Sequence, residues 1–298
     1  MAIAAGFLPP SRTNGGMLRG NGGGEMQKRK RRNALLLVLG VLVLAVWWGN
    51  WRLVTQTLAV PVWDLPEALA GLRIAVLSDL HDRTFGQDNA RLVRAVAKAE
   101  PDLIALCGDL ADTDYDPDAV QALAQQLCQI APVFYVTGNH EWAARIVPQL
   151  TEQLTDCGVT VLANDYRKLT YRGASFILAG VHDPNGPYDM KTPSQLVEQI
   201  RQENGQTPIV MLSHRNDALD QWAALGVSAV LCGHGHGGVI RLPLLGGLFG
   251  PGGEWRPAYT AGLYRQGRTS MAVSRGLGGP LRIGNPPQIL IAELQPES

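Results

Sequence analysis

Five short apolar runs, each followed after one or two small residues by histidine, aspartate or asparagine, most constrain how this chain can fold. The runs span residues 72–77, 103–107, 133–136, 209–212 and 229–232. Continuous apolar runs of this length are typical of strands buried on both faces. Segments with helical spacing of apolar residues separate them, at 89–99, 117–130, 141–157 and 217–225. With further β-like runs at 259–264, 270–274 and 289–294, the chain predicts a mixed α/β body.

The residues directly after these runs are rich in side chains that bind metal ions. They are Asp79-Leu80-His81, Gly108-Asp109, Gly138-Asn139-His140-Glu141, Ser213-His214 and Gly233-His234-Gly235-His236. The carboxyl ends of strands in an α/β sheet gather at one edge, where ligands bind. Each segment alone also fits an ordinary turn, but five at strand ends favour one shared site. His182 has no partner at a meaningful spacing and is expected to be a structural or surface histidine.

The candidate ligands outnumber those that one ion needs. They are Asp79, His81, Asp109, Asn139, His214, His234 and His236. Imidazole nitrogens and hard oxygens together suit Mn, Fe or Zn. A carboxylate such as Asp109 can bridge two ions, and paired ions clamp the attacking and leaving oxygens of a displacement at phosphorus. The residues therefore predict two divalent metal ions and hydrolysis of a phosphate ester by attack of metal-bound hydroxide.

The ordered motifs resemble the calcineurin-like metallophosphoesterases over roughly residues 72–298. The resemblance implies a four-layer α/β/β/α sandwich of two mixed β-sheets. It also implies two ligand sets that share one bridging carboxylate: Asp79, His81 and His236 for the first metal, Asn139, His214 and His234 for the second, and Asp109 between them. His140 would contact the phosphate and protonate the leaving group, oriented by Asp109.

A narrower resemblance is to the membrane-anchored bacterial branch of the family, whose members are described as phosphodiesterases. It rests on an N-terminal hydrophobic segment and on the stretch from Val273 to Pro287. An envelope lipid or a cell-wall phosphodiester is the expected substrate. Two alternatives stay open: an enzyme like the UDP-2,3-diacylglucosamine pyrophosphatase of lipid A biosynthesis, and a catalytically inactive scaffold. The sequence differs from the usual pattern of this branch at Arg215-Asn216, Gly235, Val239 and Gln288. None of these residues is a candidate metal ligand, so the differences concern the identity of the substrate and leave the catalytic chemistry unchanged.

Five consecutive basic residues, Lys28–Arg32, precede fifteen residues without a polar side chain, Ala34–Trp48. Continued through Trp51, the run can span a slightly thinned bilayer with tryptophans at one interface. A buried core helix would leave the basic residues unexplained. A cleaved signal peptide would need small residues just after the run, although Arg31-Arg32 also resembles a twin-arginine export signal. We expect an uncleaved transmembrane helix over 34–53, with the N-terminus in the cytoplasm and the body outside.

The formal net charge of zero divides into +6 on residues 1–32 and −6 on residues 33–298. Neither part has a basic folded face of the kind that binds nucleic acid, and no protein partner is evident. Residues 1–33 are expected to form a disordered basic tail, residues 54–71 a linker, and residues 72–298 the phosphoesterase domain. The acidic run Asp112, Asp114, Asp116 and Asp118 is expected to be a solvated loop near the site mouth.

Overall fold

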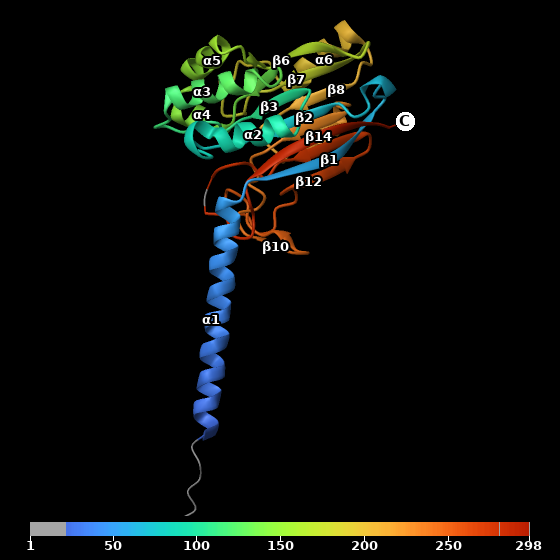
Figure 1. The fold of residues 1–298 in the computed structure, drawn as a ribbon. Helices are drawn as coiled ribbons and strands as arrows, with labels where there is room; N and C mark the ends of the chain where they lie inside the picture. The colour runs from blue at the N-terminus through green and yellow to red at the C-terminus, as the bar shows by residue number, and fades with distance from the viewer. Residues whose placement is uncertain (1–21, 280, 298) are drawn as a thin grey trace, which may run out of the picture. The chain divides into compact units, whose positions relative to one another are not determined.

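Two six-stranded β-sheets lie at the centre of the computed structural model, which describes residues 22–279 and 281–297 (Figure 1). The first sheet has the order β1 (Val54–Trp63), β14 (Gln288–Glu297), β2 (Arg73–Leu77), β3 (Leu103–Cys107), β4 (Val133–Val136) and β5 (Thr160–Val161). The second has the order β12 (Gly262–Gln266), β13 (Thr269–Val273), β9 (Ala229–Cys232), β8 (Ile209–Leu212), β7 (Ala174–Gly180) and β6 (Asp165–Tyr171). Parallel and antiparallel pairs occur in both, so both sheets are mixed, as the resemblance to the family implied.

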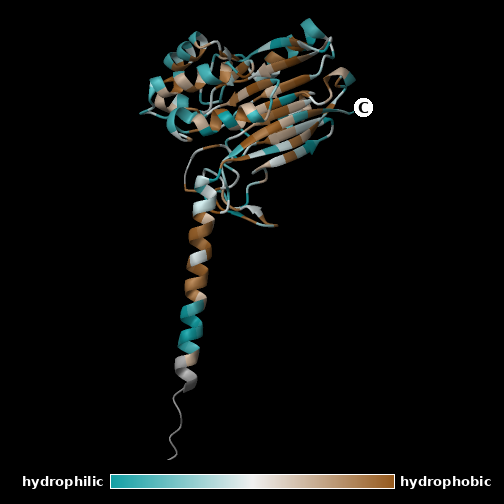
Figure 2. Cartoon of the chain, in the orientation of Figure 1, coloured by the Kyte–Doolittle hydropathy of each residue, from teal (hydrophilic) through white to brown (hydrophobic). Residues whose placement is uncertain are grey.

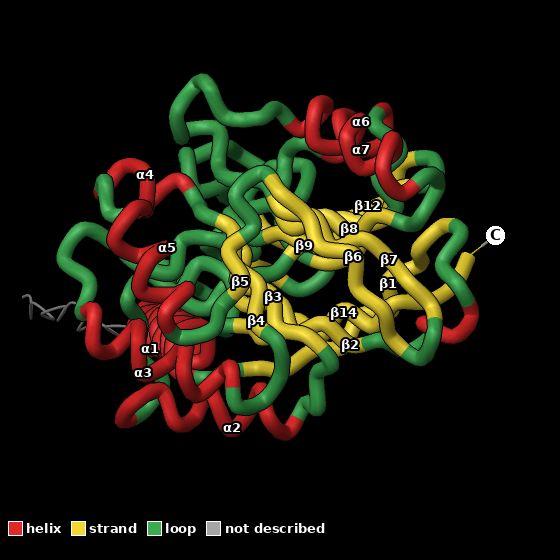
Figure 3. The backbone as a smooth tube through the Cα atoms, turned by 90° about the horizontal axis from the view of Figure 1, so that it is seen from above, coloured by secondary structure: helices red, strands yellow, loops and turns green. Residues whose placement is uncertain are grey.

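The sheets pack face to face because successive side chains of each strand point to opposite faces. Ile74 and Val76 of β2 belong to the same buried cluster between the sheets as Phe176 and Leu178 of β7. Ala75 and Leu77, which alternate with them, face the helices α2 (Ala90–Lys98), α3 (Pro117–Cys128) and α5 (Val147–Asp156). Helices α6 (Pro193–Asn204) and α7 (Leu219–Ala224) cover the second sheet (Figure 3). These four layers confirm the predicted α/β/β/α sandwich.

The helix predicted over 141–157 is two helices, α4 (Asn139–Ala144) and α5. Arg145 adopts a left-handed backbone conformation, with φ of 61°, and ends α4. Pro148 then lies in the first turn of α5, where its missing N–H is tolerated. Five further pieces were not anticipated: strand β5, the hairpin β6–β7, helix α6, the short hairpin β10 (Arg241–Leu242) and β11 (Gly246–Gly247), and the 3-10 turn Gln87–Asn89.

The linker expected over residues 54–71 is wrong for most of its length. Residues 54–63 form β1, which pairs in parallel with β14, and Glu67–Leu69 form a 3-10 turn. Val60 and Val62 of β1 are buried between the sheets. Pro61 donates no hydrogen bond, which an edge strand tolerates because only one of its sides is paired. The folded body therefore includes the residues that directly follow the apolar helix.

That helix, α1 (Gly22–Trp51), begins earlier than the sequence analysis predicted. Residues 22–33 are helical, which corrects that part of the expected disordered tail, while residues 1–21 lie outside the described residues. Lysine, arginine, glutamine and methionine favour helix, so the basic segment can continue the apolar one. Met26–Trp51 is long and apolar enough to cross a membrane, and Figure 2 shows the apolar band along it. Residues from Leu44 onward form one compact unit with the sheets.

Candidate metal centre

All seven predicted ligands follow the carboxyl ends of neighbouring strands. Asp79 and His81 follow β2, Asp109 follows β3, Asn139 follows β4, His214 follows β8, and His234 and His236 follow β9. Five of them, Asp79, His81, Asp109, His234 and His236, have φ between 46° and 63°. Non-glycine residues adopt this left-handed conformation at an energetic cost, and such strain is concentrated at functional sites. The backbone is thus bent at each strand end so that these side chains can approach one another.

Asp79, His81 and His236 form a first cluster, with one possible ligand atom of each within 4.8 Å of the others. His236 Nε2 lies 3.8 Å from Asp79 Oδ1. Burial raises the pKa of Asp79, but the nearby His236 and His214 outweigh this effect and lower the pKa overall. Asp79 is therefore a carboxylate. His81 Nδ1 lies 3.3 Å from Asp112, which leaves His81 Nε2 to face the cluster.

A second cluster of possible ligand atoms surrounds the Nε2 atom of His214, a residue that is buried. His214 Nδ1 lies 2.9 Å from the carbonyl oxygen of Cys107, to which it can donate. Three further atoms lie about 3 Å from His214 Nε2: Asp109 Oδ2 at 3.1 Å, Asn139 Oδ1 at 3.0 Å and His234 Nδ1 at 3.0 Å. With His214 neutral and its proton on Nδ1, all four atoms offer lone pairs toward one point. Such an arrangement requires a cation or an extra proton.

Asp109 lies between the two clusters. Its Oδ2 atom is 3.1 Å from His214 Nε2, 3.7 Å from His81 Nε2 and 4.0 Å from His140 Nε2. Burial raises the pKa of Asp109, but the charge of His214 beside it outweighs burial and holds the pKa well below its usual range. The same pairing raises the pKa of His214 to about 10, against burial, which lowers it. A carboxylate in this position can serve both clusters at once.

Two atoms aimed into the centre, Asp109 Oδ2 and His81 Nε2, are buried and form no hydrogen bond among the described residues. A buried carboxylate oxygen without a partner is costly, so these atoms fit ligands of a bound cation. Imidazole nitrogens with carboxylate and amide oxygens suit divalent Mn, Fe or Zn. The residues present therefore fit the metal ions that the sequence predicted.

Glu141 fixes the loops that carry the ligands, a role that sequence reasoning did not assign. Its buried carboxylate accepts hydrogen bonds from the backbone N–H groups of Asp109 at 3.1 Å, Leu110 at 2.6 Å and Gly138 at 2.8 Å. A β-carbon at Gly138 would overlap the Asp109 carboxylate, so only glycine fits there. The Gly138-Asn139-His140-Glu141 segment thus combines a ligand with the groups that position Asp109.

Asp112 belongs to the centre, which corrects its expected place in a solvated loop. Its Oδ1 atom lies 2.7 Å from His140 Nδ1, and its carboxylate also reaches His81. The hydrogen bond from Asp112 raises the pKa of His140, more than partial burial lowers it. From His140, Asp109 accepts a hydrogen bond of the backbone N–H only, at 2.9 Å. Asp112 rather than Asp109 therefore orients the His140 ring. In the sequence, Asp112 is one of four aspartates at alternate positions of 112–118, so nothing distinguished it from its exposed neighbours.

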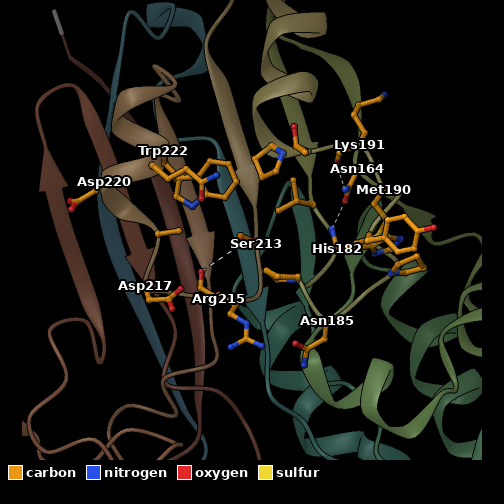
Figure 4. Close-up of a pocket in the computed structure, with 18 residues that line it drawn as sticks. Asn164, His182, Asn185, Met190, Lys191, Ser213, Arg215, Asp217, Asp220 and Trp222 are labelled. Atoms are coloured by element: carbon orange, nitrogen blue, oxygen red, sulfur yellow. Dashed lines mark hydrogen bonds between the residues drawn. The ribbon is translucent and has the colours of Figure 1, made fainter.

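A pocket of about 760 Å³ adjoins the centre through Ser213 and Arg215, the neighbours of His214. Arg215 donates to the buried Asp183 carboxylate at 2.7 and 3.1 Å. Figure 4 shows Arg215 and Asn185 at one end of the pocket and Trp222 at the other. The wall mixes charged, amide and aromatic groups, as small-molecule sites commonly do.

His182 lies in the wall of this pocket and in none of the ligand clusters. Its Nδ1 atom lies 2.9 Å from Thr137 Oγ1, and burial lowers its pKa to about 4. This neutral, hydrogen-bonded ring agrees with the structural role expected from the sequence.

Comparison with known proteins assigns the family. Residues 72–238 match the model of the calcineurin-like phosphoesterases. The chain is 32% identical over 248 residues to a Danio rerio transmembrane protein with metallophosphoesterase domain, covering 77% of this chain but only 54% of that protein. It is 30% identical over 234 residues to the phosphodiesterase YaeI of Escherichia coli, covering 76% of this chain and 83% of YaeI. It is 29% identical to the Bacillus subtilis metallophosphoesterase YkuE over 78% of this chain and 82% of YkuE.

The match extends through the strand ends that carry the two clusters, so geometry and comparison agree. The chain belongs to the calcineurin-like phosphoesterase family and is a metal-dependent hydrolase of phosphoric esters.

Proposed function

We propose that this protein is a membrane-anchored phosphodiesterase with two metal ions and a catalytic unit outside the cytoplasm. The observation that carries the proposal is the position of Asp109 Oδ2, 3.1 Å from His214 Nε2 and 3.7 Å from His81 Nε2. A carboxylate between two clusters of ligand atoms is the arrangement that a pair of ions needs. Asp79, His81 and His236 would hold one ion, Asn139, His214 and His234 the other, and Asp109 would bridge them.

When bound, the ions supply Lewis acidity that activates water and offsets the charge developing on the phosphoryl oxygens. The protein's own residues fix the geometry of that chemistry. The two carboxylate oxygens of Glu141 accept hydrogen bonds from the backbone N–H groups of Asp109 and Leu110. The proposed bridging carboxylate of Asp109 therefore has little freedom to move. Asp112 holds Nδ1 of His81 and leaves Nε2 facing the centre. These contacts preorganise the ligands before substrate binds.

His140 is the proposed general acid. Asp112 accepts from its Nδ1 atom at 2.7 Å and raises its pKa, which favours the protonated ring. Its Nε2 atom faces Asp109 from 4.0 Å, and 47% of the side chain is exposed. The ring can therefore donate a proton from Nε2 to the departing oxygen of the ester and recover the proton from solvent.

A phosphodiester is the proposed substrate class, and the pocket beside His214 is the proposed site for one of its organic groups. The name of the Escherichia coli relative supports the reaction. Trp222 at one end and Arg215 near the metal centre suit a group with an apolar part next to an anionic phosphate. An envelope lipid or a cell-wall phosphodiester has this chemistry.

The side of the membrane follows from the charges that flank α1. Lys28–Arg32 precede its apolar part, whereas Arg52 is the one basic residue close behind it. Such asymmetry keeps the basic end in the cytoplasm. A pyrophosphatase acting on a nucleotide-linked lipid A precursor would instead need its centre at the cytoplasmic face, so orientation separates these two proposals.

Metal content tests the ligand assignment. The full chain in detergent, dialysed with Mn²⁺, is expected to retain two equivalents by elemental analysis, because two clusters are present. His214→Ala removes the atom at which the second cluster converges and is expected to lower the retained metal. His182→Ala, whose ring lies outside the clusters, serves as the matched control. Full metal in His214→Ala would contradict the assignment.

Leaving-group dependence tests His140. His140→Ala is expected to lower kcat by about 10²–10⁴-fold for an alkyl phosphodiester. The loss should be much smaller for bis-(p-nitrophenyl) phosphate, whose leaving group needs little protonation. Asp112→Asn should show the same trend more weakly, and Asp114→Asn, an exposed neighbour in the same acidic run, should match wild type. Equal losses on both esters would exclude general-acid catalysis by His140.

A blocking substitution tests the pocket. Asn185 is exposed at the pocket end near Arg215, and Asn185→Trp is expected to narrow that end. The KM for bis-(p-nitrophenyl) phosphate should rise while metal content stays at the wild-type value. Asp189→Trp adds the same bulk to the same loop outside the pocket lining and should leave KM unchanged. An unchanged KM in Asn185→Trp would place the organic group elsewhere.

Reporters fused after Ser298 test the orientation in bacterial cells. Alkaline phosphatase is expected to be active and green fluorescent protein dark, because the body should lie outside the cytoplasm. Replacing the five basic residues Lys28–Arg32 with glutamine should weaken that bias. Bright fluorescence with the natural sequence would refute the orientation and favour the cytoplasmic alternative.

A further inference from the structure

Exposed apolar side chains gather at one place on the catalytic unit. Beyond α1, the described residues expose six large apolar or aromatic side chains, and all except Tyr188 lie within residues 242–281. We call these five the apolar patch: Leu242, Leu244, Leu245, Trp255 and Leu281. Leu244 is 106% exposed and Trp255 is 64% exposed. Contiguous exposed apolar groups mark sites of interaction with proteins or membranes.

The patch lies on a frame of hydrogen-bonded segments, residues 239–256 and 281–285. Strands β10 and β11 pair through Leu242 and Gly246, and Leu244 lies in the turn between them with φ of 68°. The Trp255 ring packs edge-on against Phe249 at a centroid distance of 5.0 Å. Ile240 forms a bridge with Ile283, which joins this frame to the segment that contains Leu281. Leu242 is therefore held by paired backbone, and Leu244 and Leu245 lie in the short turn that joins the two paired strands.

The last turns of α1 contact the same frame. The N–H of Gly284 donates to the carbonyl of Ala45 at 3.0 Å, and Asn50 Nδ2 donates to the carbonyl of Arg282 at 2.7 Å. A β-carbon at Gly49 would lie 2.6 Å from that carbonyl oxygen, so glycine permits the close approach. Trp48 and Leu242 line one cavity of about 350 Å³. The apolar patch therefore adjoins the tryptophan-rich end of the helix.

The charges around this face are mainly positive. Arg52 stacks over the Trp48 ring at 3.9 Å and lines the same cavity as Arg241 and Arg275. Arg256 is exposed next to Trp255. Glu254 is the single acidic residue between 239 and 257. Apolar side chains with arginines around them match a bilayer interface that contains anionic lipids.

We propose that the apolar patch enters the headgroup region of an anionic phospholipid bilayer beside the end of α1 and holds the catalytic unit against the membrane surface. The inference rests on the proposed anchoring by α1. It adds a second contact with the membrane, made by the surface of the folded unit itself. Leu244 would enter deepest because it is fully exposed in the turn of the hairpin, and the exposed Trp255 ring would lie beside it at the headgroups.

The same frame supports the metal centre. Asn285 Nδ2 donates to the carbonyl of His236 at 2.6 Å, and the N–H of Gly278 donates to the carbonyl of Asp79. The side chain of Arg241, a residue of β10, also donates to the backbone carbonyl of Gly237, the residue after His236. The centre would thus be held close to the bilayer, and we expect its substrate to be a phosphoester embedded in the membrane rather than one free in water.

An environment-sensitive label tests the contact in the full chain. A fluorophore of the NBD type is attached to Leu244→Cys after Cys128→Ser and Cys157→Ser; Cys107 and Cys232 are buried. The chain is reconstituted in vesicles of phosphatidylcholine and phosphatidylglycerol. We expect blue-shifted emission that lipids spin-labelled near the headgroup quench strongly. Tyr188→Cys, labelled in the same background, should emit as in water and resist quenching.

Water-like emission at Leu244 would overturn the proposal. A blue shift that lipid quenchers do not affect, but that grows with protein density in the vesicle, would assign the patch to a second copy of the chain and also overturn it.

A charge substitution tests the functional consequence. Leu244→Glu with Leu245→Glu changes exposed side chains only and is expected to preserve turnover of water-soluble bis-(p-nitrophenyl) phosphate. Turnover of a p-nitrophenyl phosphodiester carrying an acyl chain inserted in the vesicle should fall several-fold. Equal turnover of both esters would refute the link between patch and substrate. If the wild type hydrolysed neither ester, the proposed function would fail while the label at Leu244 still tested the membrane contact.

Discussion

A buried carboxylate surrounded by lone pairs is the constraint on which the rest of this site depends. Asp109 is 1% exposed, and its Oδ2 atom forms no hydrogen bond among the described residues, with His214 Nε2 3.1 Å away as its nearest partner for an ion pair. Ion pairing with His214 keeps its pKa low, so the group stays charged. An isolated charge at that depth would be strongly unfavourable. The strained strand ends, the glycine at Gly138 and the buried Glu141 all serve to hold this charge where cations can meet it.

The sheets explain why residues so distant in sequence can meet at one point. The ligands come from β2, β3 and β4 in the first sheet and from β8 and β9 in the second. Each strand is buried on both faces, so its position and register are fixed by packing on two sides. The ends of such strands move little, which suits a centre whose ligand atoms must lie within a few ångströms of one another.

Much of this could be predicted from the sequence because the chemistry lies beside strong local signals. The strands 103–107, 133–136, 209–212 and 229–232 were predicted to the residue, and the seven candidate ligands do converge. Strand β1 was missed because Thr55, Gln56 and Thr57 are exposed, so its apolar alternation covers only its second half. Asp112 was missed because its partners, His81 and His140, are distant in sequence. Contacts made only through tertiary folding leave no local pattern.

The pairing of β1 with β14 has a consequence for how the protein is made. Val54 pairs with Gln288, so the strand that directly follows α1 is completed by a strand that is synthesised much later. Such a long sequence separation delays closure of the sheet. Until β14 is available, β1 has an unpaired edge, a state prone to wrong pairing. Its three exposed polar residues and its proline are features that keep an edge strand soluble during that interval.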